Sequence, residues 1–223
     1  MRAEPGTRPR EVAVTLQGIR LKGLLRLPPG ATGIVLFAHG SGSGRLSPRN
    51  NYVAEQLGAA GLATLLVDLL TGQEEEIDAV TAELRFDIPL LTGRLAGVTA
   101  WALEQPELGK LAIGYFGAST GAAAALAAAA RVPAVAAVVS RGGRPDLAGD
   151  ALPRVRAATL LIVGGDDEQV LELNRQALAR LRCEAKLEIV PGATHLFEEP
   201  GTLEQVAALA ADWFTDHLGQ AAG

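Results

Sequence analysis

The sequence contains a single cysteine, Cys183, so no disulfide can form within the chain. This scarcity agrees with a reducing compartment. The charged and polar start, MRAEPGTRPREVAVTL, lacks the apolar core of about 7–15 residues that a secretory signal contains. The one long apolar tract, residues 121–140, is interrupted by Arg131 and Pro133 before it reaches the roughly 18–20 residues that a membrane span needs. We therefore expect a soluble, cytoplasmic protein with no membrane partner.

Positive charge is also scarce, because the 223 residues include 20 Lys and Arg against 25 Asp and Glu, a formal net charge of −5. A chain with this balance binds a phosphate backbone poorly, so we expect no nucleic-acid partner. With 48% hydrophobic residues the chain can bury a core and is not disordered by composition. It shows no repeat, linker or change of composition, which favours a single domain over residues 1–223.

Strand-like and helix-like segments alternate along the chain. Two near-alternating runs, EVAVTL and LKGLLRL, predict an antiparallel start, and the continuous apolar runs that follow, such as GIVLFAH and ATLLIVGG, are typical of strands buried on both faces. Helical patterns lie between the runs, at about residues 48–60, 85–104, 120–131, 169–182 and 202–218. We expect an α/β fold with a mostly parallel sheet and helices on both of its faces.

Local signals mark several helix borders. Ser47 followed by Pro48 predicts an N-cap and a first helical turn, and Thr202 with Gln205 has the form of a capping box. The acidic run TGQEEEIDAVTAEL, residues 71–84, requires no more than a solvated loop and the start of a helix.

Residues 117–121, GASTG, have the G-x-S-x-G pattern between a strand-like run and an alanine-rich helical run. This is the context of a nucleophile elbow, a strained turn that lifts a serine hydroxyl above the edge of a sheet. The turn needs its glycines because the strand and the helix pass very close together there, and alanines let the helix lie near the sheet. We predict that Ser119 is a nucleophile; the alternative is that small residues only mark a tight turn.

A serine hydroxyl is a weak nucleophile without a base and a third group that orients the base. His195 lies in the loop PGATHLFEEPG after the run AKLEIV, and Asp166 and Asp167 follow the run ATLLIV. The chain order of serine, aspartate and histidine is that of the α/β-hydrolases. The candidate catalytic set is therefore Ser119, one of the two aspartates and His195, whereas His217, near the end of the last helix, is expected at the surface.

Two backbone N–H groups are expected to hold the oxyanion of the transition state. One belongs to Thr120, directly after the nucleophile, and the other to the loop in FAHGSGSG. We assign the second N–H to Ser41, although Gly40 and Gly42 are neighbours able to serve. The side chain of His39 is expected to brace this loop instead of acting as the base.

Two other classes of protein agree with parts of the sequence. The HGSGSG turn, with Asp68 at the end of the next strand, suggests a dinucleotide-binding protein. Its glycines are spaced G-x-G-x-G instead of G-x-G-x-x-G, and this interpretation leaves Ser119 and His195 without a role. The second alternative is a hydrolase-like fold that binds without catalysis, against which the ordered catalytic set argues.

Six segments taken together resemble the dienelactone hydrolase-like branch of the α/β-hydrolases, and the likeness covers nearly the whole chain. They are HGSGSGRLSPRN, GLATLLVDLLT, GYFGASTGAAAAL, SRGGRPDLA, LLIVGGDDEQVLELN and PGATHLFEEPGTLEQVA. The resemblance implies an α/β-hydrolase fold with a mostly parallel eight-stranded sheet and no large cap domain, and hydrolysis of small carboxylic esters or lactones through a covalent intermediate. The name-giving enzymes use a cysteine nucleophile where this chain has Ser119, so the substrate class is stated as carboxylic esters and not as dienelactone itself.

The family pattern also implies a choice between the two aspartates. After this strand it has a glycine, two variable residues and then the acid, so counting from Gly164 assigns the catalytic role to Asp167 and leaves Asp166 as a helix cap or a solvated residue. Arg85 and Arg141 match family-like stretches and could receive a substrate carboxylate, or lie on the surface without such a role. The expected mechanism needs no cofactor and no metal, its partner is a small-molecule ester, and a homo-oligomer stays open.

Overall fold

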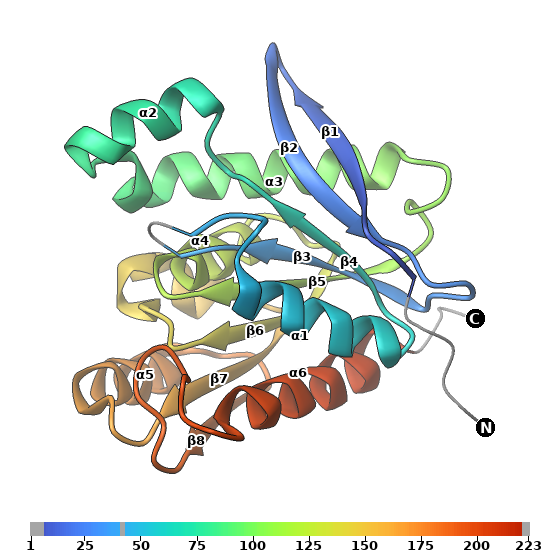
Figure 1. Ribbon diagram of the computed structural model, residues 1–223. Coiled ribbons are helices and arrows are strands. Elements are labelled where there is room, and N and C mark those ends of the chain that lie inside the picture. The colour runs from blue at the N-terminus through green and yellow to red at the C-terminus, as the bar shows by residue number, and fades with distance from the viewer. Residues whose placement is uncertain (1–6, 41–42, 220–223) are drawn as a thin grey trace.

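An eight-stranded sheet runs through the centre of the protein, whose residues 7–40 and 43–219 are described by a computed structural model (Figure 1). The strands span Arg10–Leu16 (β1), Ile19–Arg26 (β2), Gly33–Ala38 (β3), Ala63–Val67 (β4), Ala112–Ala118 (β5), Val135–Arg141 (β6), Ala158–Gly164 (β7) and Ala185–Val190 (β8). They lie in the order β1-β2-β4-β3-β5-β6-β7-β8, and β2 pairs antiparallel with both β1 and β4. All other pairs are parallel, which confirms the mostly parallel sheet with an antiparallel start.

Helices cover both faces of this sheet (Figure 1). They span Pro48–Ala59 (α1), Gly72–Thr81 (α2), Ile88–Glu104 (α3), Thr120–Ala129 (α4), Glu168–Arg180 (α5) and Thr202–Leu218 (α6). α1 and α6 pack against one face and against each other, whereas α3, α4 and α5 lie on the opposite face. The expected cover on both faces is therefore confirmed.

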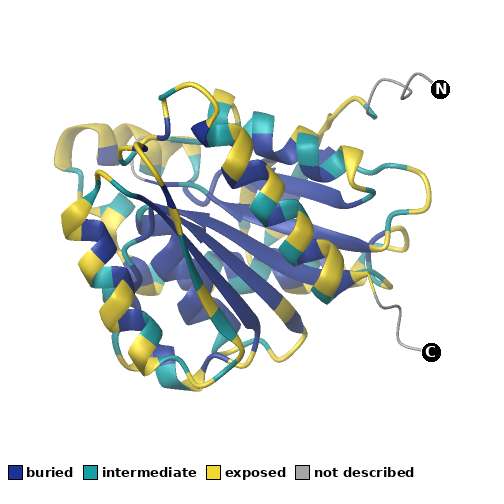
Figure 2. Cartoon of the chain, turned by 90° about the horizontal axis from the view of Figure 1, so that it is seen from below, coloured by how far each residue is buried: buried dark blue, intermediate teal, exposed yellow. Residues whose placement is uncertain are grey.

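The strands in the middle of the sheet are buried on both sides. All six residues of β3 and all five of β4 are buried, as their continuous apolar runs predict. Figure 2 shows the strands as a dark-blue centre between helices whose outward faces are exposed. On the face covered by α1 and α6, the rings of Phe37 and Phe116 lie 4.8 Å apart, so neighbouring strands are also joined through their side chains.

The alanine-rich helix α4 is buried along its whole length. Its small side chains let the helix lie close to the sheet, because an interior is close-packed and larger side chains would hold the backbones apart. This close approach places the first turn of α4 against the carboxyl ends of β3 and β5. The alanines therefore position the turn in which Ser119 lies.

Two local expectations need correction. The acidic run after β4 forms a full helix, α2, which begins with a capping box between Thr71 and Glu74. No capping box forms at Thr202, because the N-cap of α6 is Gly201 and the Thr202 hydroxyl instead donates to the carbonyl of Glu199 at 2.7 Å. The expected N-cap at Ser47 is confirmed, since its side chain accepts from the N–H of Asn50.

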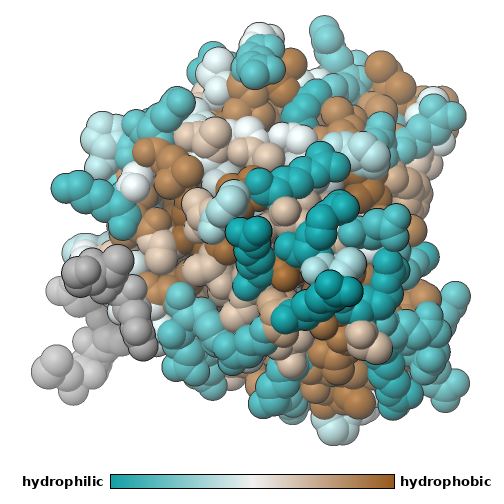
Figure 3. All heavy atoms as spheres, turned by 180° about the vertical axis from the view of Figure 1, so that it is seen from behind, coloured by the Kyte–Doolittle hydropathy of each residue, from teal (hydrophilic) through white to brown (hydrophobic). Residues whose placement is uncertain are grey.

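The connections at the carboxyl edge of the sheet are short in the described residues. Besides α2 they add only the 3₁₀ segments Leu84–Phe86 and Pro145–Arg154, so nothing in this part of the chain forms a large cap. No helix within residues 7–40 and 43–219 combines the length and the apolar character that crossing a membrane requires. Seen from behind, hydrophilic and hydrophobic residues are interspersed over the surface (Figure 3).

Candidate active site

Ser119 occupies a strained turn between β5 and α4. Its backbone angles, φ 51° and ψ −122°, lie in a region that non-glycine residues rarely adopt. The turn leaves no room for side chains at the flanking glycines: a Cβ on Gly117 would lie 2.4 Å from Cα of Ala122, and one on Gly121 would lie 2.2 Å from the carbonyl oxygen of Ala38. The local geometry is that of the nucleophile elbow that the GASTG pattern predicts.

His195 and Asp167 form a hydrogen-bonded pair at the same edge of the sheet. Nδ1 of His195, in the loop after β8, lies 2.7 Å from Oδ2 of Asp167, which follows β7. Since the carboxylate can only accept, Nδ1 donates, and the neutral ring then presents Nε2 as an acceptor. Asp166, the preceding residue, is exposed. The structure therefore joins His195 to the aspartate that the family pattern favours.

Buried apolar residues anchor the loop that carries His195. Ala193 and Phe197, on either side of the histidine, are almost completely buried against the layer that includes α6. Phe197 adopts φ 54°, a strained conformation that the packing of its ring holds in place. The buried side chains of these two residues therefore fix the position of the loop from which the imidazole extends.

Ser119 and His195 line one cavity of about 200 Å³. The carboxyl ends of the parallel strands meet at this edge of the sheet, which brings together segments that are far apart in the sequence (Figure 1). The other residues that line the cavity are Gly40, Ser43, Arg49, Ala118, Arg141 and Leu196. Serine and histidine therefore face the same space, and Asp167 binds the ring that borders it.

The structure describes one of the two expected oxyanion donors. Thr120 begins α4 directly after the serine and is buried, so its backbone N–H belongs to the first turn of the helix. Ser41, the other expected donor, lies outside the described residues. Gly40 lies close to the serine, because a Cβ on Gly40 would lie 3.0 Å from Cβ of Ser119. The oxyanion roles of both residues stay predictions.

The loop after β6 supports the candidate site through its backbone, a role that was not predicted from the sequence. The N–H of Ser119 donates to the carbonyl of Arg141 at 3.2 Å, and the N–H of Arg144 donates to the carbonyl of Ser119 at 3.1 Å. Between these arginines, Gly142 adopts φ 51° and lies against His195, where a Cβ would be 3.2 Å from its carbonyl oxygen. The signal was the Gly-Gly pair directly after a strand-like run in SRGGRP.

A second cavity of about 340 Å³ adjoins the first and shares Gly40 and Ser43 with it. Arg85, one of the two arginines considered for a substrate carboxylate, borders this cavity but is held by Asp78 through its backbone N–H at 2.9 Å and its Nε at 2.6 Å. Although burial alone would raise the pKa of Asp78, the hydrogen bonds from Arg85 outweigh it and lower that pKa. Arg85 is therefore already paired in the protein.

His39 braces the loop after β3, as expected. Its Nε2 lies 3.3 Å from the backbone N–H of Leu69 and accepts from it, which ties this loop to the segment after β4. Asp68 is also engaged, because its carboxylate accepts from the backbone N–H of Arg45 at 2.7 Å and from Nη1 of the same residue at 2.6 Å. A carboxylate held in this way is poorly placed to bind a ribose hydroxyl, which weakens the dinucleotide interpretation.

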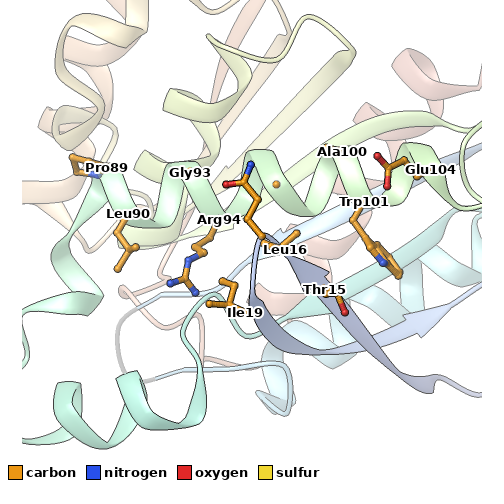
Figure 4. Close-up of a pocket in the computed structure, with 12 residues that line it drawn as sticks. Thr15, Leu16, Ile19, Pro89, Leu90, Gly93, Arg94, Ala100, Trp101 and Glu104 are labelled. Carbon is orange, nitrogen blue, oxygen red and sulfur yellow. The ribbon is translucent and has the colours of Figure 1, made fainter.

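A larger groove of about 820 Å³ lies away from these residues, between the β1–β2 hairpin and α3 (Figure 4). Leu16 and Ile19 of the hairpin and Leu90, Arg94 and Trp101 of α3 line it. Arg94 is paired with Glu74 at 2.7 Å. The groove contains none of the predicted catalytic residues, so its volume does not make it the candidate active site.

His217 lies on α6, far along the chain from the elbow. Its Nδ1 lies 2.7 Å from the carbonyl of Trp213 and its ring rests against the indole, with centroids 4.3 Å apart. The other ring nitrogen, Nε2, lies 3.4 Å from Glu184. This histidine is half-buried instead of fully exposed and serves the packing of the helix.

Residues 21–219 match the sequence model of the dienelactone hydrolase family, and the elbow and the histidine–aspartate pair both lie within that range. The chain belongs to the dienelactone hydrolase family. A dienelactone hydrolase from Anabaena variabilis ATCC 29413, known from its crystal structure, has 60% sequence identity to this family member. The two structures have a TM-score of 0.93 over 95% of this chain and 99% of that one. The α/β-hydrolase fold and the family resemblance inferred from the sequence are thus confirmed.

Other relatives extend the comparison in two directions. Est1E from Butyrivibrio proteoclasticus is only 17% identical but has a TM-score of 0.79 over 94% of this chain and 99% of Est1E, which shows a shared fold. Two proteins from strains of Mycobacterium tuberculosis, provisionally named phosphoribosyl transferases, are 60% identical over 218 residues. Those residues are 97% of this chain and 48% of each relative, so the chain spans about half the length of the curated relatives it matches.

Proposed function

We infer that this family member is a serine hydrolase that cleaves small carboxylic esters or lactones through an acyl-enzyme. The observation that carries the proposal is the joint placement of Ser119, on its strained turn, and His195, paired with Asp167, around one cavity. Each of these residues follows the carboxyl end of a different strand, as the mechanism of the fold requires.

The first half of the reaction acylates the serine. Nε2 of His195 accepts the proton of the Ser119 hydroxyl while the oxygen attacks the ester carbonyl carbon. The carboxylate of Asp167 stabilises the imidazolium that results, and the N–H groups of Thr120 and Ser41 hold the oxyanion. When the tetrahedral intermediate collapses, the imidazolium gives its proton to the departing alkoxide, which leaves as an alcohol.

The second half repeats these steps with water. His195 takes a proton from the water molecule that attacks the acyl carbon, and then returns a proton to the Ser119 oxygen. The carboxylic acid departs and the serine is regenerated. The two halves together are balanced: one ester and one water are consumed, and one acid and one alcohol are released.

The name of the mycobacterial relatives suggests a second activity, phosphoribosyl transfer. Those proteins contain a further half that this chain does not match, and the name can describe chemistry of that other half. The elbow and the His195–Asp167 pair support acyl transfer, because they supply a nucleophile, a base and an orienting acid. We therefore propose esterase activity for this chain.

Treatment with a fluorophosphonate followed by peptide mass spectrometry tests the proposal directly. We expect one adduct, on Ser119, and we expect Ser119→Ala to lose on the order of 10⁴–10⁶ in kcat on p-nitrophenyl acetate. The matched control is Thr215→Ala, which removes an exposed hydroxyl on α6 and should leave the rate unchanged. An adduct at another residue, or a Ser119→Ala variant that keeps more than a few per cent of the activity, contradicts the proposal.

A further inference from the structure

Arg141 lies beside the candidate nucleophile and is buried. It is the last residue of β6, in register with Ala118 of β5, and its carbonyl accepts from the N–H of Ser119 at 3.2 Å. Only 8% of its surface is exposed, and it borders the cavity of about 200 Å³ that also contains Ser119 and His195. The interpretation that Arg141 lies on the surface is therefore wrong.

The guanidinium of Arg141 has no counter-charge in the described part of the chain. Its Nη1 is buried without a hydrogen-bond partner, and none of the carboxylates in residues 7–40 and 43–219 forms an ion pair with it. Burial lowers the pKa of Arg141 to about 10, and repulsion from Arg49 contributes to this shift. A desolvated, unpaired charge is costly to keep in a folded protein, so its presence calls for a role outside the packing of the core.

Neighbouring arginines at this edge of the sheet are paired with acids. Arg85 is held by Asp78 at 2.6 Å, and Arg144 by Asp146 at 2.8 Å. Arg141 has no such partner, so the lack of a counter-charge is a local property of the Ser119 cavity and not of the whole edge.

Arg49 adds a second positive charge to the same cavity. Its Nη1 binds the exposed carboxylate of Glu198 at 2.8 Å, whereas its Nε is buried without a partner. The remaining lining residues are Gly40, Ser43, Ala118 and Leu196, which carry no charge, together with the candidate catalytic pair Ser119 and His195. The space next to the serine is therefore electropositive and contains unused guanidinium donors, the groups that bind carboxylates and phosphates best.

We propose that Arg141, assisted by Arg49, binds an anionic oxygen group of the substrate, a phosphate or a carboxylate, in the cavity beside Ser119 and His195. The inference rests on the proposed ester hydrolase function, because only that function makes the bound anion part of a substrate. The adjoining cavity of about 340 Å³, with the apolar residues Leu70, Ala79 and Leu91 among its lining, offers room for the uncharged remainder of the molecule. An anion fixed at Arg141 holds the ester carbonyl at the serine, so it contributes through orientation.

Three acetate esters that differ in one group measure this preference: 4-acetoxyphenyl phosphate, 4-acetoxybenzoate and the uncharged 4-acetoxybenzamide. We expect kcat/KM to be higher for the two anions than for the amide, and higher for the phosphate because two arginines face the cavity. In Arg141→Met the ratio of anionic to uncharged kcat/KM should fall by about 10²-fold, the effect of losing charge-assisted hydrogen bonds. The charge-matched control is Arg175→Met, an exposed arginine on α5, which should leave the ratio unchanged.

A binding measurement on Ser119→Ala protein separates this inference from the proposed function, because it needs no turnover. Inorganic phosphate and acetate are titrated by calorimetry, and the titrations are repeated with Ser119→Ala/Arg141→Met. Anion binding that disappears with Arg141 supports the site even if no ester is hydrolysed. Ester hydrolysis without anion preference, together with anion binding that is absent or independent of Arg141, overturns the inference and leaves the esterase proposal standing.

The melting temperature of the ligand-free variants separates a binding role of Arg141 from a structural one. The two roles predict changes in Tm of opposite sign. Because Arg141 lacks a partner, its replacement by methionine removes a buried charge and keeps a similar volume, so we expect Tm to rise by about 2–4 °C. Saturating phosphate should raise the Tm of the unmodified protein and not that of Arg141→Met. A lower Tm for Arg141→Met combined with an unchanged substrate ratio would show that the arginine is structural.

Discussion

Oδ2 of Asp167 lies 2.7 Å from Nδ1 of His195, whereas the side chain of Asp166, the preceding residue, is exposed. Successive residues of a chain leaving a strand point in different directions, so two adjacent carboxylates cannot both reach one imidazole. The contact supports the role proposed for Asp167. A substitution at Asp166 therefore serves as the control for the same substitution at Asp167.

We expect Asp167→Asn to lower kcat by about 10⁴-fold, as the equivalent change does in a serine protease, because an amide favours the wrong imidazole tautomer. Asp166→Asn changes charge in the same way beside the same strand and should stay within about tenfold of the unmodified enzyme. Steady-state kinetics of both variants on one short ester provide the comparison. The reverse ranking would transfer the acid role to Asp166.

The elbow should tolerate no methyl group at Gly121. A Cβ there would lie 2.2 Å from the carbonyl oxygen of Ala38 and 2.5 Å from that of His39, so α4 must move away from β3. We expect Gly121→Ala to lower the free energy of unfolding by about 1–3 kcal/mol or more and to cost at least about 10²-fold in kcat, since Ser119 moves with the helix.

Gly93 supplies the control for this change, because it lies in the exposed part of α3 with nothing within 4 Å of its added Cβ. Gly93→Ala should stabilise the protein by about 0.5–1 kcal/mol and leave kcat unchanged. Urea unfolding and ester kinetics measure both effects. If the two variants had the same free energy of unfolding and the same kcat, the close packing at Gly121 would not matter for stability or activity.

Alkylation of Cys183 should not inhibit the enzyme. The thiol is half-buried, lies 3.7 Å from the hydroxyl of Thr159, and borders a hollow with Ala130 and Pro153 that is separate from the Ser119 cavity. We expect iodoacetamide-treated protein to keep its activity, with modification verified by mass spectrometry. Loss of activity in proportion to alkylation would point instead to a cysteine nucleophile, as in the name-giving enzymes of the family.

Acid should destabilise the fold partly through Asp78. The hydrogen bonds from Arg85 keep the pKa of Asp78 below its ordinary value in the folded protein, despite the opposing effect of burial. A carboxylate with a lowered pKa stabilises the folded state above its unfolded pKa of about 3.9, and this contribution is lost as the pH falls through the folded value. The difference in Tm between the unmodified protein and Asp78→Asn should therefore shrink as the pH is lowered from about 5 to 2.

The control for the acid experiment is Asp150→Asn, whose carboxylate is 99% exposed and only 3.3 Å from Arg180 at the surface. An exposed pair of this kind contributes little, so its difference in Tm should stay small and nearly constant with pH. If the difference for Asp78→Asn were equally flat, the pairing with Arg85 would not stabilise the charged form.

The fold and part of the candidate site could be predicted from the sequence because they depend on local patterns. Continuous apolar runs identify buried strands, the GASTG pattern at residues 117–121 predicts the strained turn, and the order of Ser119, the aspartates and His195 favours an α/β-hydrolase fold. These signals come from neighbours in the chain or from chain order, so they need no knowledge of packing. The helix α2 was not predicted in full, although Thr71 and Glu74 have the spacing of the capping box with which it begins.

Only the tertiary structure decided which arginines are paired and which are buried without a counter-charge. Arg85 and Arg141 look alike in the sequence, but folding places Asp78 next to the first and no acid of the described residues next to the second. The desolvation of Arg141, its approach to Arg49 and the contact of Gly142 with His195 arise when parallel strands bring distant segments to one edge. Burial and electrostatic pairing are sums over such distant neighbours, and a local sequence pattern carries no record of them.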